Sequence, residues 1–219
     1  MRKRAAEFTG ACEEAVHAGD RDRLAVLVVQ AYSEGVRPEV MRECLLKGLE
    51  HARCKLMTSR LCLPEFLLAM DVVNHGLERI TELDEAERDD SGIPLVIGVV
   101  QGDPHDLGKN IIAAVYRAYG YRVVDLGRNV EQEKFLEAVK NHEARILALS
   151  AMMSTTTPFM AEIITAVRSR GYRIAVMAGG AFIDAAMAAR FGADGYAESA
   201  ATVIEKTKEA YERVFGEKR

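Results

Sequence analysis

The sequence predicts an α/β protein built in two parts, a bundle of helices followed by a doubly wound sheet of parallel strands. Three observations carry this prediction. Apolar residues recur at helical spacing through the first part of the chain, a charged stretch follows, and the rest alternates short apolar runs with amphipathic segments. Regular alternation of this kind is typical of a parallel sheet covered on both faces. We therefore expect a helical domain at 1–85, a charged linker at 86–92 and an α/β domain at 93–219.

Four helices are expected in the first domain, at 7–17, 20–32, 38–49 and 63–80. Gly19 and Gly35 suit the ends of the first two helices, and Asp20 can cap the start of the second. Pro38 suits the first turn of the third helix. Four antiparallel helices joined by short loops form a bundle. Packing alone is the simplest role of such a bundle.

The stretch from Thr81 to Gly92 differs from its surroundings because charged residues dominate it. These residues are Glu82, Asp84, Glu85, Glu87, Arg88, Asp89 and Asp90. Such a composition predicts a weakly structured segment, and the domain boundary should fall inside it.

The second domain is expected to contain five strands, at 95–100, 122–126, 146–150, 174–178 and 195–197. Helices are expected at 109–119, 130–140, 158–169, 182–191 and 199–215. This alternation predicts a flavodoxin-like, or Rossmann-like, five-stranded doubly wound sheet. The loops after the first, third and fourth strands should then gather at the carboxyl edge of the sheet, where ligands bind in this architecture.

One short loop at that edge carries the residues most suited to chemistry. Asp103 and His105 follow the first strand with one residue between them, and Gly108 opens the next helix. An Asp that accepts a hydrogen bond from one ring nitrogen orients the imidazole and makes its other nitrogen a better metal ligand. Gly108 leaves room for a bulky group against the backbone. The alternative is a helix-capping loop with a solvated histidine.

The pattern D-x-H-x-x-G resembles the cobalamin-binding signature of methionine synthase and of the corrinoid proteins in methyltransferase systems. The resemblance extends to Ser150-Ala151-Met152 and to Gly179-Gly180, which follow at the spacing found in that family. Met152 stands where the family usually has Leu, a change of similar volume that should cost little. The resemblance implies cobalamin as cofactor, as methylcobalamin or the Co(I) corrinoid. It also implies base-off binding, with His105 as the axial ligand to cobalt.

The resemblance assigns roles to further residues. Ser150, Gly179 and Gly180 would line a channel for the nucleotide tail of the cofactor, although the glycine pair could be an ordinary turn. Ser154 would meet the corrin ring. Thr156 would hydrogen-bond Asp103 and complete a relay behind the axial ligand, although the hydroxyls at 154–157 could simply cap a helix.

In this family a four-helix bundle caps the upper face of the corrin ring. Leu63-Pro64 matches the start of the family's fourth cap helix, and Leu56 occupies the position of a family Phe. Arg53 stands where the family has Gly, a departure from the pattern. The resemblance thus implies an aliphatic lid that includes Leu56 and Leu63.

The two-part layout resembles free-standing corrinoid proteins of the methanol, methylamine, glycine betaine and aryl methyl ether systems. Such proteins are not catalytic alone. They shuttle a methyl group from a substrate-specific methyltransferase to a second methyltransferase, whose acceptor is tetrahydrofolate or coenzyme M, and a reductive activase serves them. The sequence leaves the methyl donor open. The alternatives are a cobalamin-dependent sensor and the small cobalamin-binding subunit of a mutase.

Composition narrows the possible partners and the location. The chain is 49% hydrophobic and 28% charged, with a net charge of -4. These values give no reason to expect a nucleic acid partner, and no apolar run is long enough to span a membrane. Without C-x-x-C spacing or a signal peptide, the cysteines are expected to be buried free thiols in the cytoplasm, with a thiol metal site as the alternative. They are Cys12, Cys44, Cys54 and Cys62.

Overall fold

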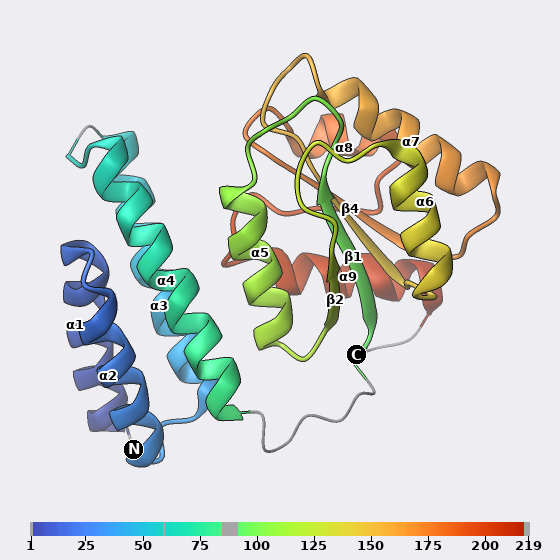
Figure 1. Ribbon diagram of the computed structural model, residues 1–219. Coiled ribbons are helices and arrows are strands. Elements are labelled where there is room, and N and C mark those ends of the chain that lie inside the picture. Colours follow the sequence, from blue (N-terminus) through green and yellow to red (C-terminus); the bar gives the residue numbers. More distant parts are fainter. Residues whose placement is uncertain (1, 59, 85–91, 217–219) are drawn as a thin grey trace. The chain divides into compact units, whose positions relative to one another are not determined.

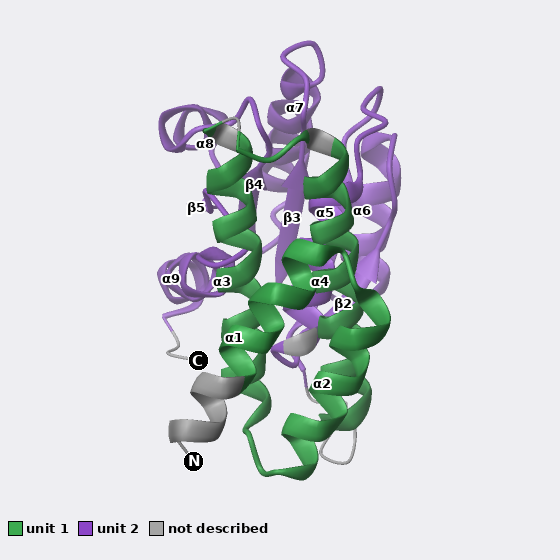
Figure 2. Ribbon diagram, turned by 90° about the vertical axis from the view of Figure 1, so that its left-hand side faces the viewer, with its two compact units in different colours: residues 1–89 green, residues 90–219 purple. Residues whose placement is uncertain are grey.

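The computed structural model describes residues 2–58, 60–84 and 92–216. The chain divides into two compact units, residues 1–89 and 90–219 (Figures 1 and 2). Of the predicted linker at 86–92, residues 86–91 lie outside the described part of the chain. None of the helices in the described ranges is long and apolar enough to cross a membrane.

The first unit is a four-helix bundle with short connections. Asp20 caps the second helix as predicted, since its side chain accepts a hydrogen bond from the Arg23 N–H at 2.9 Å, and Pro38 begins the third helix. Apolar residues from every helix are buried in the bundle, among them Val16, Leu24 and Leu45. The helices are α1 (Arg2–Ala18), α2 (Arg21–Ser33), α3 (Pro38–Met57) and α4 (Leu63–Asp84).

The prediction of a weakly structured segment from residue 81 was wrong for its first residues, because α4 continues to Asp84. Thr81 is buried and its hydroxyl donates to the Leu77 carbonyl at 2.7 Å, within the helix. Arg42, which is 5% exposed, pairs with Asp84 and ties the last turn of α4 to α3. Charge alone suggested a linker, whereas buried contacts from α3 keep these residues helical.

The expectation that all four cysteines are buried was wrong for two of them. Cys12 and Cys44 are buried, whereas Cys54 and Cys62 are exposed near the connection between α3 and α4. Burial raises the pKa of the Cys12 thiol to about 12, so that thiol stays protonated. In the described part of the chain, no group of three or more His, Cys, Asp or Glu side chains could hold a metal ion.

The second unit alternates strands and helices throughout. Its strands are β1 (Pro94–Val99), β2 (Arg122–Asp125), β3 (Ile146–Ser150), β4 (Ala175–Gly179) and β5 (Gly195–Tyr196). Its helices are α5 (Leu107–Ala118), α6 (Gln132–Asn141), α7 (Thr157–Ser169), α8 (Ala185–Phe191) and α9 (Val203–Phe215).

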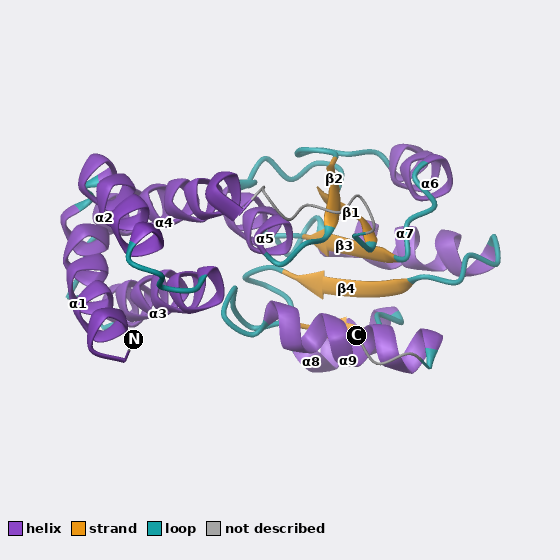
Figure 3. Cartoon of the chain, turned by 90° about the horizontal axis from the view of Figure 1, so that it is seen from below, coloured by secondary structure: helices purple, strands orange, loops and turns teal. Residues whose placement is uncertain are grey.

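All neighbouring strands pair in parallel, in the order β2-β1-β3-β4-β5. This is the flavodoxin-like order, so the predicted fold is confirmed. Helices α5 and α9 cover one face of the sheet, and α6, α7 and α8 cover the other. Figure 3 shows α5 on one side of the sheet and α6 and α7 on the opposite side. Across the first face, the Tyr116 hydroxyl of α5 meets the Thr207 hydroxyl of α9 at 2.6 Å, with both side chains fully buried.

Three helices begin later than predicted, each for a local reason. Residue 130 does not start α6, because the Val130 N–H donates to the Val99 carbonyl at 3.0 Å and extends the sheet. Helix α8 starts after Asp184, whose side chain caps it through the Met187 N–H. The residues before α9 form a turn closed by Thr202 and Ser199.

The register of the sheet brings three strand ends together. Val99 pairs with Ser150, and Ser150 pairs with Gly179. Strands β1, β3 and β4 therefore end side by side at the carboxyl edge. From β1 the chain adds β2 on one side of the sheet and then β3, β4 and β5 on the other, which makes the gap between β1 and β3 the switch point where open α/β sheets bind ligands.

Candidate functional site

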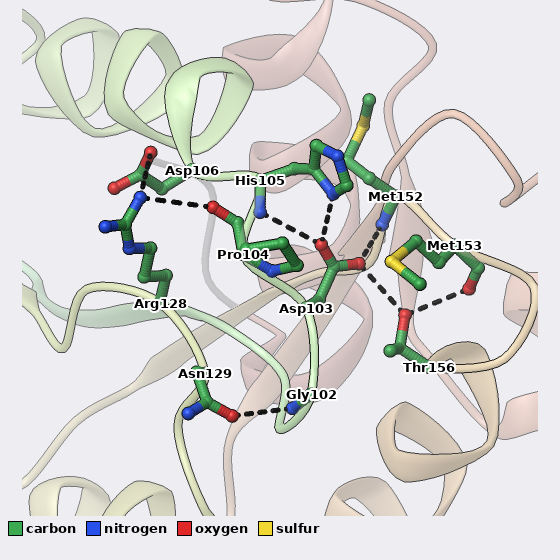
Figure 4. Close-up of polar contacts among 10 residues, drawn as sticks. All are labelled: Gly102, Asp103, Pro104, His105, Asp106, Arg128, Asn129, Met152, Met153 and Thr156. Atoms are coloured by element: carbon green, nitrogen blue, oxygen red, sulfur yellow. Dashed lines mark hydrogen bonds and ion pairs between the residues drawn. The ribbon is translucent and has the colours of Figure 1, made fainter.

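The loop between β1 and α5 leaves the sheet through a tight turn. The Asp103 N–H donates to the Val100 carbonyl at 3.2 Å, and Gly102 within this turn has φ of +79°. A positive φ at the third position of a turn suits glycine. After the turn, the Asp103 side chain points toward the loop between β3 and α7 (Figure 4).

The Asp103 carboxylate is fully buried and accepts hydrogen bonds on both oxygens. Its Oδ1 lies 2.8 Å from the His105 ring Nδ1 and 3.0 Å from the His105 N–H. Its Oδ2 accepts from the Met152 N–H at 2.6 Å and from the Thr156 hydroxyl at 2.9 Å. One side chain thus joins the loops that follow β1 and β3.

These contacts decide the charge of the carboxyl group. Burial by itself raises the pKa of Asp103, but hydrogen bonds from the Met152 and His105 N–H groups, the His105 ring and the Thr156 hydroxyl together lower it below its ordinary value. Asp103 is therefore an anion at neutral pH. A buried anion with this many donors holds them in fixed positions.

His105 presents its ring outward from this buried anion. Its side chain is 55% exposed, whereas that of Asp103 is 0% exposed. Because Asp103 accepts at Nδ1, the proton of a neutral ring belongs on Nδ1, and Nε2 carries the free lone pair. An imidazole held by a carboxylate in this way suits metal ligation.

Thr156 lies where the relay predicted behind His105 requires it. Its hydroxyl is within 2.9 Å of both Asp103 Oδ2 and the Met153 carbonyl, so its single proton can face either acceptor. Thr156 is the N-cap residue of α7 but makes no side-chain capping bond. The capping alternative therefore does not describe Thr156. Ser154 is exposed at the same edge.

Gly179 ends β4 and Gly180 follows it, and the two glycines differ in what a side chain would meet. A Cβ on Gly180, which has φ of +137°, would lie 1.8 Å from the Ala151 carbonyl oxygen. A Cβ on Gly179 would meet nothing within 4 Å, and the same holds for Gly108. Gly180 is thus required by the backbone of the neighbouring loop, whereas Gly179 and Gly108 border open space. Ser150, half-buried, pairs with Gly179 at the strand ends.

The structure places the two predicted lid residues in the helical unit. Leu56 is half-buried in the last turn of α3, and Leu63 begins α4. Both residues belong to the unit 1–89, whereas the site at the sheet edge belongs to the unit 90–219. The side chain of Leu63 lies outside the described part of the chain.

Sequence reasoning missed two contributions to the site. Met152 acts through its backbone N–H, which no side-chain pattern could reveal. Asn129 accepts the Gly102 N–H on its Oδ1 at 2.7 Å (Figure 4). Its position after Gly127, in a segment between strand and helix, was the available signal, since Asn tolerates the positive φ of such turns.

Comparisons with known proteins agree on one family. A family profile for the B12 binding domain matches residues 93–205. Dimethylamine corrinoid protein 1 of Methanosarcina acetivorans is 32% identical over 192 residues, which cover 86% of this chain and 90% of that protein. Trimethylamine corrinoid protein 1 of Methanosarcina mazei is 32% identical over 209 residues, covering 93% of this chain and 97% of that protein.

Solved structures give the same result. The monomethylamine corrinoid protein of Methanosarcina barkeri has a TM-score of 0.71 and 25% identity, covering 95% of this chain and 99% of that chain. The methanol:cobalamin methyltransferase complex MtaBC of Methanosarcina barkeri gives a TM-score of 0.60 and 29% identity, covering 97% of this chain and 81% of the matched chain.

The first prediction concerns the buried carboxylate. In Asp103→Asn, the amide NH2 must face one of the N–H or O–H donors that now point at an oxygen. We expect the free energy of unfolding of the cofactor-free protein to fall by about 1–3 kcal/mol at neutral pH. Denaturant unfolding of both proteins measures the difference, and equal stabilities would contradict the network.

The difference in the free energy of unfolding between the wild type and Asp103→Asn should depend on pH. Because the pKa of Asp103 is lowered in the folded protein, its ionised form contributes full stability above the ordinary value of 3.8. That contribution is lost as the pH falls through the lower folded pKa. The gap between the wild type and Asp103→Asn should therefore narrow below pH 3.8, and a gap that widens there would contradict the assignment.

Proposed function

The chain belongs to the corrinoid proteins of methyltransferase systems, a family built on the B12 binding domain, and we propose that it carries a methyl group from a methylamine on cobalamin held by His105. One observation supports the ligand assignment most strongly. Asp103 engages Nδ1 of His105 at 2.8 Å, which directs Nε2 outward at the carboxyl edge of the sheet.

The residues at this edge suit the cofactor. Bound cobalamin supplies a cobalt centre that accepts a methyl group from one enzyme and donates it to another. His105 Nε2 would be the lower axial ligand, with Asp103 holding the ring and its tautomer. Thr156 would tune how strongly Asp103 holds the Nδ1 proton of the ring, because its hydroxyl can donate to Asp103 or to the Met153 carbonyl instead.

The open space beside Gly179 supports a place for the cofactor tail at the ends of β3 and β4, and the open space beside Gly108 leaves room for the cofactor at the start of α5. Ser150, half-buried at the end of β3, would line this channel. Ser154 and the half-buried Met152 would meet the corrin ring from the next loop. Gly180 has a different task in this proposal, which is to let the chain pass the Ala151 carbonyl.

The proposed partners follow from the family. Relatives are named for dimethylamine and trimethylamine, and a similar chain belongs to a complex with a methanol-specific methyltransferase. We propose a methylamine-specific methyltransferase as donor partner. A second methyltransferase would use tetrahydrofolate or coenzyme M as acceptor, and a reductive activase would restore the cofactor. The named relatives favour this carrier over the sensor and mutase alternatives.

A cytoplasmic location is part of the proposal. It is supported by four free cysteines, since unpaired thiols persist in reducing compartments.

The methyl donor and the ligand are tested together in the full-length protein loaded with cobalamin and reduced. Methyltransferases specific for monomethylamine, dimethylamine, trimethylamine and methanol are each added with their substrate. We expect a methylamine enzyme to change the absorption spectrum of the bound cofactor. In His105→Ala the rate of this spectral change should fall at least about tenfold. The control is His142→Ala, because His142 is exposed and lies 37 positions after His105 in the chain, and it should leave the rate unchanged. A response to methanol alone would overturn the donor class, and an unaffected His105→Ala would overturn the ligand.

The tail channel predicts opposite results for the two glycines. Gly179→Val points a side chain into open space, so the cofactor-free protein should keep its stability while cobalamin affinity falls by about tenfold or more. Gly180→Ala should destabilise the cofactor-free protein, because its Cβ would collide with the Ala151 backbone. Equilibrium binding and denaturant unfolding measure the two quantities. Unchanged affinity in Gly179→Val would place the tail elsewhere.

We also propose that the helical unit supplies the lid over the upper face of the cofactor, with Leu56 and Leu63 in contact with it. A half-buried Leu at the end of α3 supports this role for Leu56. Photolysis of bound methylcobalamin should be faster in Leu56→Ala than in wild type, since a loosened lid lets the methyl radical escape. Val26→Ala, on the exposed face of α2 with Val26 65% exposed, is the matched control. Equal rates in all three proteins would refute the lid.

A further inference from the structure

The segment 126–130, between β2 and α6, runs beside β1 where β1 leaves the sheet. We call it the flanking segment. The Val99 N–H donates to the Gly127 carbonyl at 2.9 Å, and the Val130 N–H donates to the Val99 carbonyl at 3.0 Å. Val100 and Val130 form a further parallel bridge. The flanking segment is therefore held in register with the residues that lead directly into the Asp103 loop.

Asn129 in this segment makes two hydrogen bonds to the loop between β1 and α5. Its Oδ1 accepts the Gly102 N–H at 2.7 Å, and its own N–H donates to the Asp103 carbonyl at 3.2 Å. Asn129 has φ of +53°, a left-handed conformation that Asn and Asp adopt more readily than other residues with side chains. The two bonds hold the peptide units on either side of the Gly102–Asp103 link.

A second contact fixes the other end of the same loop. Lys109, in the first turns of α5, is 3% exposed, and its Nζ lies 2.6 and 2.5 Å from the two carboxylate oxygens of Asp125. Asp125 Oδ1 also accepts the Gly127 N–H at 2.9 Å. The loop that carries His105 is thus tied to the β2 side at both of its ends.

The contacts from the β2 side and the contacts of the Asp103 carboxylate hold the loop from opposite sides. The side chain of Asp103 is held by Met152 and Thr156 from the β3 side, whereas its main chain is held by Asn129 from the β2 side. If only the Asp103 side chain were hydrogen-bonded, the loop could rotate together with the carboxylate. Because the main chain is hydrogen-bonded as well, His105 is held in one position.

We propose that Asn129 is a positioning residue for the axial ligand, which holds the Gly102–Asp103 main chain so that His105 Nε2 stays where it can bind cobalt. The inference rests on the proposed function of His105. It predicts that removing the hydrogen bond between Asn129 and Gly102 lowers the share of cobalt bound by histidine without unfolding the protein.

The test uses the full-length protein loaded with cobalamin that carries ¹⁵N in its dimethylbenzimidazole, in the Co(II) form. Paramagnetic resonance then distinguishes unlabelled histidine nitrogen on cobalt from the labelled base and from cobalt without an axial nitrogen. Asn129→Gly keeps the left-handed backbone without strain but removes the acceptor. Asn129→Asp keeps both the acceptor and a residue tolerant of that conformation. Glu131→Ala is the control, because Glu131 directly follows the flanking segment, is exposed, and makes no side-chain capping bond to α6.

In Asn129→Gly we expect the ratio of histidine-bound to other cobalt to fall several-fold, up to about tenfold, which is the effect of one lost hydrogen bond. Asn129→Asp should restore most of the ratio, and Glu131→Ala should leave it unchanged. Hydrogen exchange in the cofactor-free protein should show a faster-exchanging Gly102 amide in Asn129→Gly alone. A wild-type ratio in Asn129→Gly would overturn the inference. A wild-type protein without histidine nitrogen on cobalt would instead overturn the proposed function.

Discussion

One buried carboxylate organises the functional edge of the α/β unit. Asp103 is 0% exposed and accepts hydrogen bonds from His105, Met152 and Thr156. Burying a charge costs much free energy unless hydrogen bonds replace the lost water. The ionised carboxylate is therefore stable in the interior only when these donors are in place. Their hydrogen bonds hold the three residues in fixed positions around it. The orientation of the His105 ring is a consequence of this constraint.

The parallel sheet makes the constraint possible. Because β1, β3 and β4 end in register, residues 49 and 53 positions after Asp103 in the sequence meet its carboxylate. The close approach of Gly180 to the Ala151 carbonyl fixes the next loop against the same edge. A rigid edge with one exposed imidazole suits a protein that carries a reactive cofactor between enzymes, since the cofactor supplies the reactivity and the protein supplies position and protection.

The sequence was sufficient for the parts that depend on pattern. Strand and helix alternation predicted the sheet, and the resemblance to cobalamin-binding proteins implied the hydrogen bond between Thr156 and Asp103. The sequence was insufficient where contacts between distant residues decide the local structure. Arg42 keeps the charged end of α4 helical, a Cβ on Gly180 would collide with the Ala151 carbonyl, and Met152 contributes a backbone N–H. Asn129 was missed because its partner, Gly102, lies 27 positions away in the chain.

The hydrogen bond that Asp103 accepts from the His105 ring should set the tautomer of His105 and leave Nε2 bare for a metal. Nitrogen-15 NMR of the histidine rings in the cofactor-free, full-length protein tests it most directly, at a pH where the His105 ring is neutral. We expect His105 to carry its proton on Nδ1, and Asp103→Asn to shift the population toward the Nε2-protonated form. A wild-type His105 protonated mainly on Nε2 would contradict it, because that nitrogen could not then bind cobalt without first losing its proton.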